Sequence, residues 1–148
     1  MGSHLWFFYA LTTSMLWGLG YVFSEKILKA GIAPPFLMLV YLVVSVPIFL
    51  LLTHFTNNLK PGIEILASNK IISLYFAIVI ACFIVANYLI FTSISLKNAT
   101  LASLVEISYP YFTVLFTWAI FKEFQLTVAT AFGALLIFSG ITLIYLKS

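Results

Sequence analysis

The chain has 148 residues, of which 64% are hydrophobic and 18% aromatic, while only 7% are charged. Soluble domains carry roughly 25% charged residues, so this composition, with a mean hydropathy of +1.17, excludes an ordinary soluble protein and indicates an integral membrane protein. The net charge of +3 comes from lysines and glutamates scattered between apolar runs, and no basic patch of the kind that binds nucleic acid is present. Cys82 is the single cysteine, so a disulfide framework within one chain is excluded.

Five apolar runs are long enough to cross a membrane, because about 20 residues at 1.5 Å each span a hydrocarbon core of about 30 Å. The first run predicts a helix over residues 5–30 that stops at Gly31 and the following pair of prolines. The other predicted helices cover residues 35–53, 71–96, 99–121 and 126–146.

The longest connection, residues 54–70, is too polar to insert and is expected to hold a short turn of helix at the membrane surface. The apolar runs are about twice as long as barrel strands, which are about 10 residues, and their polarity does not alternate. The predicted fold is therefore an all-α bundle of five transmembrane helices that forms a single domain over residues 1–148.

An odd number of helices places the two chain ends on opposite sides of the membrane, and lysine bias then sets the orientation. The lysines divide almost evenly: Lys60, Lys70 and Lys122 lie on one predicted side, and Lys26, Lys29, Lys97 and Lys147 on the other. Two interpretations stay open, a single weakly determined orientation or a chain inserted in both orientations.

Glu106 lies inside the fourth predicted helix, about 10 Å into the hydrocarbon core and within roughly 5 Å of its midplane. An ionisable group at this depth costs about 2.5–3.5 kcal/mol and normally faces a bundle interior or a wet cavity. Pro110 lacks the N–H that would bond to the carbonyl of residue i−4, which is Glu106 itself. The sequence therefore predicts a helix break whose free carbonyl lies beside a carboxyl group, and the partner of that carboxyl must come from another helix.

Other polar and aromatic side chains fall where they could line a substrate or proton site with Glu106. They are Ser103, Tyr109 and Thr113 on the fourth helix, Trp17 and Tyr21 on the first, and Asn87 and Tyr88 on the third. Asn87 suits contact between helices as well as contact with substrate, and Glu106 could instead be protonated and purely structural. Glu25 ends the first apolar run, where we expect it to pair with Lys29 at i+4, with a cavity role as the alternative.

The fifth helix carries Ala129, Gly133 and Gly140 on one stripe, a pattern that permits close packing against another helix or a second chain. His4 and His54 have no cysteine or carboxylate at metal-ligand spacing, so no metal site is predicted. No nucleophile, base and orienting acid occur together, and no cofactor motif is complete. We therefore expect neither enzyme activity nor a cofactor.

Two stretches carry a family resemblance: LWGLGYVFSEKILKAGIAPPFL (residues 16–37) and NATLASLVEISYPYFTVLFTWAIFKEFQLTVATAFGALLIFSGITLIYL (residues 98–146). The Trp-Gly pair, the proline that starts the second helix, the mid-helix proline, the Lys-Glu turn and the glycine-containing last helix resemble an EamA-like domain of the drug/metabolite transporter superfamily. The resemblance implies transport of small metabolites or drugs, usually by two five-helix repeats of inverted orientation. This chain would supply one repeat.

These observations predict a secondary transporter of a small solute in the cell (inner or plasma) membrane. An antiparallel homodimer would rebuild the inverted repeats, and Glu106 in a central cavity would exchange protons for a cationic or amphipathic substrate by alternating access. Two alternatives remain: a facilitative carrier without proton coupling, and a non-transporting subunit that pairs with a sister half-transporter. The sequence does not specify the substrate.

Overall fold

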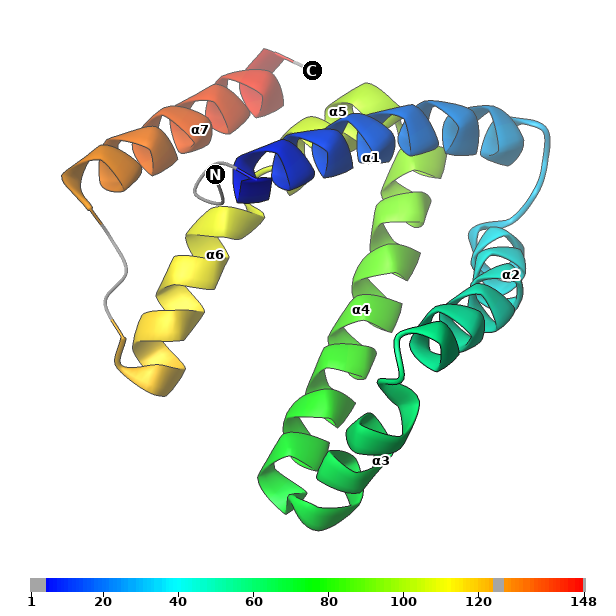
Figure 1. Ribbon diagram of the computed structural model, residues 1–148. Helices are drawn as coiled ribbons and strands as arrows, with labels where there is room; N and C mark the ends of the chain where they lie inside the picture. Colours follow the sequence, from blue (N-terminus) through cyan, green and yellow to red (C-terminus); the bar gives the residue numbers. More distant parts are fainter. Residues whose placement is uncertain (1–4, 124–126, 148) are drawn as a thin grey trace.

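The computed structural model describes residues 5–123 and 127–147, with the side chains at positions 129, 130, 144, 145 and 147 left out of the description. The elements are α1 (Leu5–Lys29), α2 (Pro34–Phe55), α3 (Leu59–Ser68), α4 (Lys70–Leu96), α5 (Ala99–Glu106), α6 (Tyr109–Phe116), the π-helix η1 (Thr117–Phe121) and α7 (Val128–Lys147) (Figure 1). Every element in these ranges is a helix, which confirms the predicted all-α class.

The boundary between α1 and α2 follows from local sequence. Gly31 adopts a positive φ of 96°, which costs glycine little because it has no Cβ. This conformation lets the N–H of Ile32 donate to the carbonyl of Ile27 (3.4 Å) and the N–H of Gly31 donate to that of Leu28 (3.1 Å). Pro34 then starts α2 at a position where its missing N–H removes no helical hydrogen bond.

Three helical segments are long and apolar enough to cross a membrane: Pro34–Phe55, Lys70–Leu96 and Ala99–Phe121. The first helix, α1, has 25 residues, but its Trp, Tyr, Gly, Ser and Thr residues make it less apolar than these three. In α7, the apolar stretch found among the described residues, Ala131–Leu143, is shorter. The structure thus indicates a multi-pass membrane protein, and the count of five spans stays a prediction.

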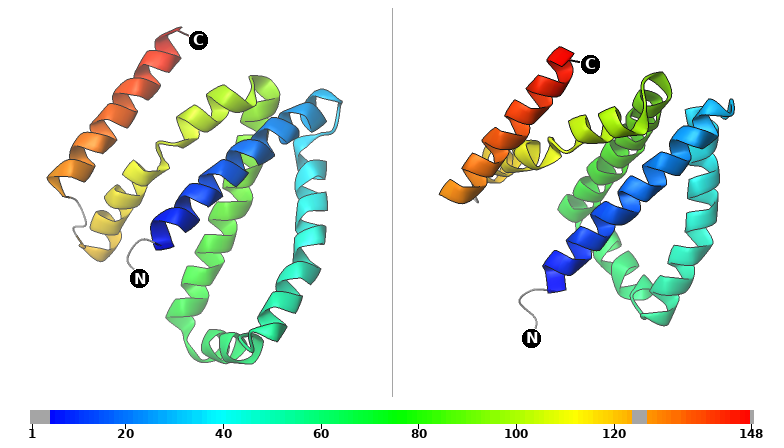
Figure 2. Two further views of the ribbon diagram at one scale, coloured as in Figure 1. Left: turned by 45° about the horizontal axis from the view of Figure 1, so that its top comes forward. Right: turned by 90° about the horizontal axis from the view of Figure 1, so that it is seen from above.

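The helices α2 and α4 form a pair that is closed at one end by α3 (Figure 2). The polar connection between them therefore holds a helix of ten residues, α3, where the sequence predicted a short turn. Asn69 caps the next helix: its side-chain oxygen accepts hydrogen bonds from the backbone N–H groups of Ile71 (3.1 Å) and Ile72 (3.2 Å). This cap fixes the start of α4.

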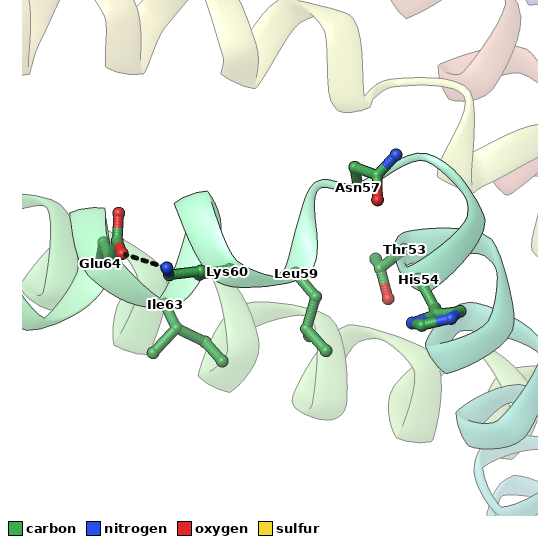
Figure 3. A pocket seen from close by; sticks show the side chains of 7 residues that line it. All are labelled: Thr53, His54, Asn57, Leu59, Lys60, Ile63 and Glu64. Carbon is green, nitrogen blue, oxygen red and sulfur yellow. Dashed lines mark ion pairs between the residues drawn. The ribbon is translucent and has the colours of Figure 1, made fainter.

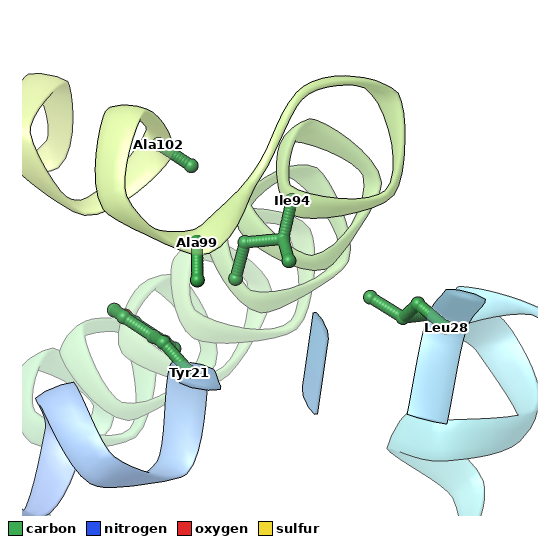
Figure 4. Packing of buried hydrophobic residues seen from close by; sticks show 5 residues of the cluster. All are labelled: Tyr21, Leu28, Ile94, Ala99 and Ala102. Carbon is green, nitrogen blue, oxygen red and sulfur yellow. The ribbon is translucent and has the colours of Figure 1, made fainter. Parts of the chain in front are cut away.

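The densest packing lies at the opposite end of α4, where α1 crosses α4 and α5. Figure 4 shows its buried residues, which are Tyr21 and Leu28 from α1, Ile94 from α4, and Ala99 and Ala102 from α5. In α6 and η1, by contrast, none of the described residues is buried. The fourth predicted span is therefore tightly held along α5 and open beyond it.

That fourth span is interrupted once and then changes its helix type. The first half, α5, ends at Glu106, and the turn residues Ile107 and Ser108 separate it from α6. The last turn is the π-helix η1, which stops at Lys122 with a positive φ of 59°. The ring of Phe121 meets that of Tyr75 on α4, with centroids 6.1 Å apart, so the far end of this span returns to α4.

Candidate functional site

The carboxyl group of Glu106 meets the hydroxyl of Tyr21, which donates a hydrogen bond of 2.8 Å to Oε1. The two residues lie 85 positions apart in the chain, on α5 and α1. The structure therefore gives Glu106 a partner from another helix, as the sequence predicted. A half-buried carboxyl with a neutral hydroxyl donor can hold either a proton or a cation without breaking a fixed ion pair.

The break beside this carboxyl follows from Pro110, the second residue of α6. The backbone N–H of Ile107 still bonds to the carbonyl of Ser103 at 3.1 Å, but Pro110 has no N–H to offer to the carbonyl of Glu106. The last residue of α5 thus presents both a carboxyl group and a carbonyl that its own helix cannot satisfy. Within a bilayer such groups are tolerated only where protein or water reaches them.

Small side chains bring Tyr21 to this position. Only 5% of Tyr21 is exposed, and its ring packs in the cluster that contains Ala99 and Ala102, whose methyl groups let α5 approach α1 closely. Trp17 stands one turn earlier on α1 with its ring edge toward Tyr21, at 5.4 Å between centroids and 63° between planes. Trp17 and Tyr21 therefore form an aromatic pair on the face of α1 that meets Glu106.

A second carboxyl group, that of Glu25, reaches the other end of α5. Its Oε2 accepts a hydrogen bond of 2.7 Å from the backbone N–H of Ala99, the first residue of that helix. Its Oε1 pairs with the ammonium group of Lys29, so the ion pair expected from the i+4 spacing is present. No local sequence pattern indicates the contact with Ala99, because 74 positions separate the two residues.

Three of the remaining predicted site residues, Ser103, Thr113 and Asn87, form side-chain hydrogen bonds within their own helices. Ser103 donates to the carbonyl of Thr100 (3.1 Å), and Thr113 to that of Tyr109 (3.1 Å). Tyr109 itself is 65% exposed at the start of α6.

On α4, the carboxamide of Asn87 donates to the carbonyl of Phe83 (2.8 Å), and the side chain of Tyr88 is exposed. Of the predicted set, the structure thus pairs Glu106 with Tyr21, and Tyr21 with Trp17 on the same helix, whereas the polar groups of Ser103, Thr113 and Asn87 are satisfied locally.

The glycines of α7 face open space in this chain. A Cβ atom added at Gly133 or Gly140 would meet nothing within 4 Å, so neither glycine supports close packing against another part of the described chain. The side chain of Ala129 lies outside the described residues. Packing of this stripe against a second chain stays a prediction.

A surface hollow occurs where α2 meets α3 (Figure 3). It is lined by Thr53, His54, Asn57, Leu59, Lys60, Ile63 and Glu64. The helix α4, which leads from α3 towards α5, is about 39 Å long, from 26 steps of 1.5 Å. The hollow is open and shares no residue with the carboxyl site, so we assign it no part in the chemistry.

Within the described ranges, His, Cys, Asp and Glu form no group of three or more that could hold a metal ion.

Together, the long apolar helices indicate a multi-pass membrane protein, in which Tyr21 and Glu106 form a polar contact beside a helix break. The model of the EamA-like transporter family matches residues 4–146. The chain belongs to this family, which confirms the resemblance seen in its sequence and makes it a membrane transporter of the drug/metabolite type. No curated protein and no solved structure matches the chain.

Proposed function

We propose that the protein is a secondary transporter of a small solute in which Glu106 binds substrate and proton in turn. The observation that carries this proposal is the hydrogen bond of 2.8 Å between Tyr21 and Glu106 at a helix break. Broken helices near the bilayer midplane are where many secondary transporters bind their substrates. The family match supplies the class of protein, and the carboxyl group supplies a chemical role within it.

In the proposed mechanism, the carboxylate of Glu106 accepts a hydrogen bond from the hydroxyl of Tyr21 while the site is empty. A cationic or amphipathic substrate binds to this carboxylate, with the aromatic rings of Trp17 and Tyr21 beside it. A proton arriving from the other side of the membrane neutralises the carboxylate and releases the cation. Exchange follows because substrate and proton compete for one group.

We further propose that two copies form the transport unit in the cell membrane, as an antiparallel homodimer. The exposed surface of α6 and the open glycines of α7 leave room for a second chain. Reporter fusions at both chain ends test this arrangement. Equal signals on the two sides support dual topology, whereas signals on one side alone remove the antiparallel dimer.

Proteoliposomes with a trapped pH-sensitive dye test proton coupling. The probes are the amphipathic cations ethidium and tetraphenylphosphonium and the zwitterions alanine and betaine, with protein-free liposomes as the baseline. We expect a cation gradient to drive proton movement in the wild type and none in Glu106→Gln. The matched control is Glu64→Gln, an acid-to-amide change at an exposed position of α3. Undiminished coupling in Glu106→Gln overturns the proposal.

A facilitative carrier is the second candidate, because the partner of Glu106 is a neutral hydroxyl, which also suits a permanently protonated carboxyl. Flux of a zwitterion that ignores the pH gradient would favour it. The open face of α7 likewise suits a subunit that pairs with a sister half-transporter. Absence of flux from the pure chain, with one stoichiometric partner on co-purification, would select that third possibility.

A further inference from the structure

We propose that Glu25 is a positioning residue for Glu106, acting through α5. This inference deepens the proposed function and rests on it for its consequence in transport. Its structural basis is that α1 holds both ends of the same short helix: Glu25 bonds to the N–H of Ala99, and Tyr21 bonds to the carboxyl of Glu106.

The length of α5 and the spacing of Tyr21 and Glu25 along α1 allow α1 to contact both ends of α5. Seven steps along α5 cover about 10 Å, and the four steps from Tyr21 to Glu25 along α1 cover about 6 Å. Residues four apart share one face of a helix, so one face of α1 reaches both ends of α5 through two long side chains. The pairing of Glu25 with Ala99 and of Tyr21 with Glu106 also means that the two helices run antiparallel here.

Glu25 is chemically suited to hold a helix N-terminus. The first N–H groups of a helix have no partner within it, and the positive end of the helix dipole favours a carboxylate. The side chain of Asn98 satisfies one of these groups, that of Leu101 (2.8 Å), and Glu25 satisfies that of Ala99. Lys29 pairs with the second carboxylate oxygen, so both oxygens of Glu25 are engaged.

The helix α5 has only eight residues, and two residues outside any helix separate it from α4 and from α6. Its position is set by its contacts with other segments, chiefly α1 and α4. The place of Glu106 therefore depends on what fixes the start of α5, as well as on Tyr21. When Glu25 releases Ala99, we expect α5 to shift and Glu106 to leave the hydroxyl of Tyr21.

Labelling of Glu106 by a hydrophobic carbodiimide at one fixed pH, followed by mass spectrometry, tests this inference without any substrate. Glu25→Ala should raise the initial rate by about threefold or more, the factor that corresponds to losing an average hydrogen bond between membrane helices. Tyr21→Phe should change the rate in the same direction. Glu25→Gln should stay near wild type, because its amide oxygen can still accept from Ala99.

The matched control is Glu64→Ala, which removes the acid of another i,i+4 pair, with Lys60, on α3. Should Glu25→Ala fail to fold, Glu25→Asp keeps the charge but withdraws the carboxylate by one methylene, and it should also raise the rate. The inference is overturned if the initial rate of Glu106 labelling stays within a factor of two of the wild-type rate in every folded variant that lacks the contact with Ala99. If Glu25→Ala raises the labelling rate but the wild-type protein shows no proton-coupled flux, the inference stands and the proposed function is wrong.

Discussion

The hydrogen bond between Tyr21 and Glu106 can be weighed by replacing its donor. Tyr21→Phe removes one hydroxyl from a side chain that is 5% exposed and leaves the ring in the cluster with Ala99 and Ala102. The loss of stability therefore comes from the hydrogen bond and hardly from packing. Its size depends on the charge of Glu106.

The two charge states of Glu106 predict different free energies for this hydrogen bond. Hydrogen bonds between membrane helices contribute on average about 0.6 kcal/mol and at most about 1.7, whereas hydrogen bonds to charged groups contribute about 1.5–3 kcal/mol. A protonated Glu106 predicts a value near the first figure, and an ionised Glu106 predicts a value in the second range. The measurement thus also separates the facilitative carrier, which needs a protonated carboxyl, from the proton exchanger in its empty state.

The assay is a double-mutant cycle of Tyr21→Phe with Glu106→Leu, followed by reversible unfolding in mixed micelles. The cycle removes the effects that each substitution has alone and leaves the coupling between the two side chains. A coupling energy indistinguishable from zero would mean that the hydroxyl and the carboxyl do not interact, and the proposed site would lose its basis.

Three further changes have defined outcomes. Gly31→Ala should destabilise the protein by about 1–2 kcal/mol, because alanine resists the positive φ at the end of α1. The control is Gly62→Ala inside α3, which should be neutral or stabilising in the same unfolding assay. Asn98→Ala should cost about 1 kcal/mol by removing the side-chain cap of α5, and normal stability would contradict the cap. Pro110→Ala restores an N–H that can donate to the carbonyl of Glu106. Hydrogen exchange over residues 107–111 should therefore slow, and transport should fall. Unchanged exchange would show that the helix break does not depend on the proline.

The features that could be predicted from sequence are those set by neighbours in the chain. Apolar length marks the helices, and Gly31 with the following prolines marks the first boundary. Likewise, Pro110 identifies Glu106 as the residue whose carbonyl is left free, since the loss of a helical N–H acts at a fixed spacing of four. The ion pair of Glu25 with Lys29 follows from the same short-range geometry.

The missed features depend on contacts between distant segments. The sequence indicated that Glu106 needs a partner from another helix, and it placed Tyr21 among many candidates without pairing the two. Nothing local marks Glu25 as the cap of α5, because the donor, Ala99, lies on a different helix. The π-helix at residues 117–121 is similarly silent in sequence, since no proline or glycine accompanies it.

The helix α5 carries a carboxyl partner at each end, and the two ends differ electrostatically. At its N-terminus, partial positive charge on free N–H groups favours an anion, so the carboxylate of Glu25 is a stabilising and permanent partner. At its C-terminus, Glu106 adds a carboxyl to an end that already carries partial negative charge and a carbonyl left free by Pro110. If Glu106 is ionised, a cation or a proton relieves this excess of negative charge, while the hydroxyl of Tyr21 relieves it only in part. The helix dipole thus favours a structural role for Glu25 and an exchanging role for Glu106, and it argues for a cationic rather than an anionic substrate.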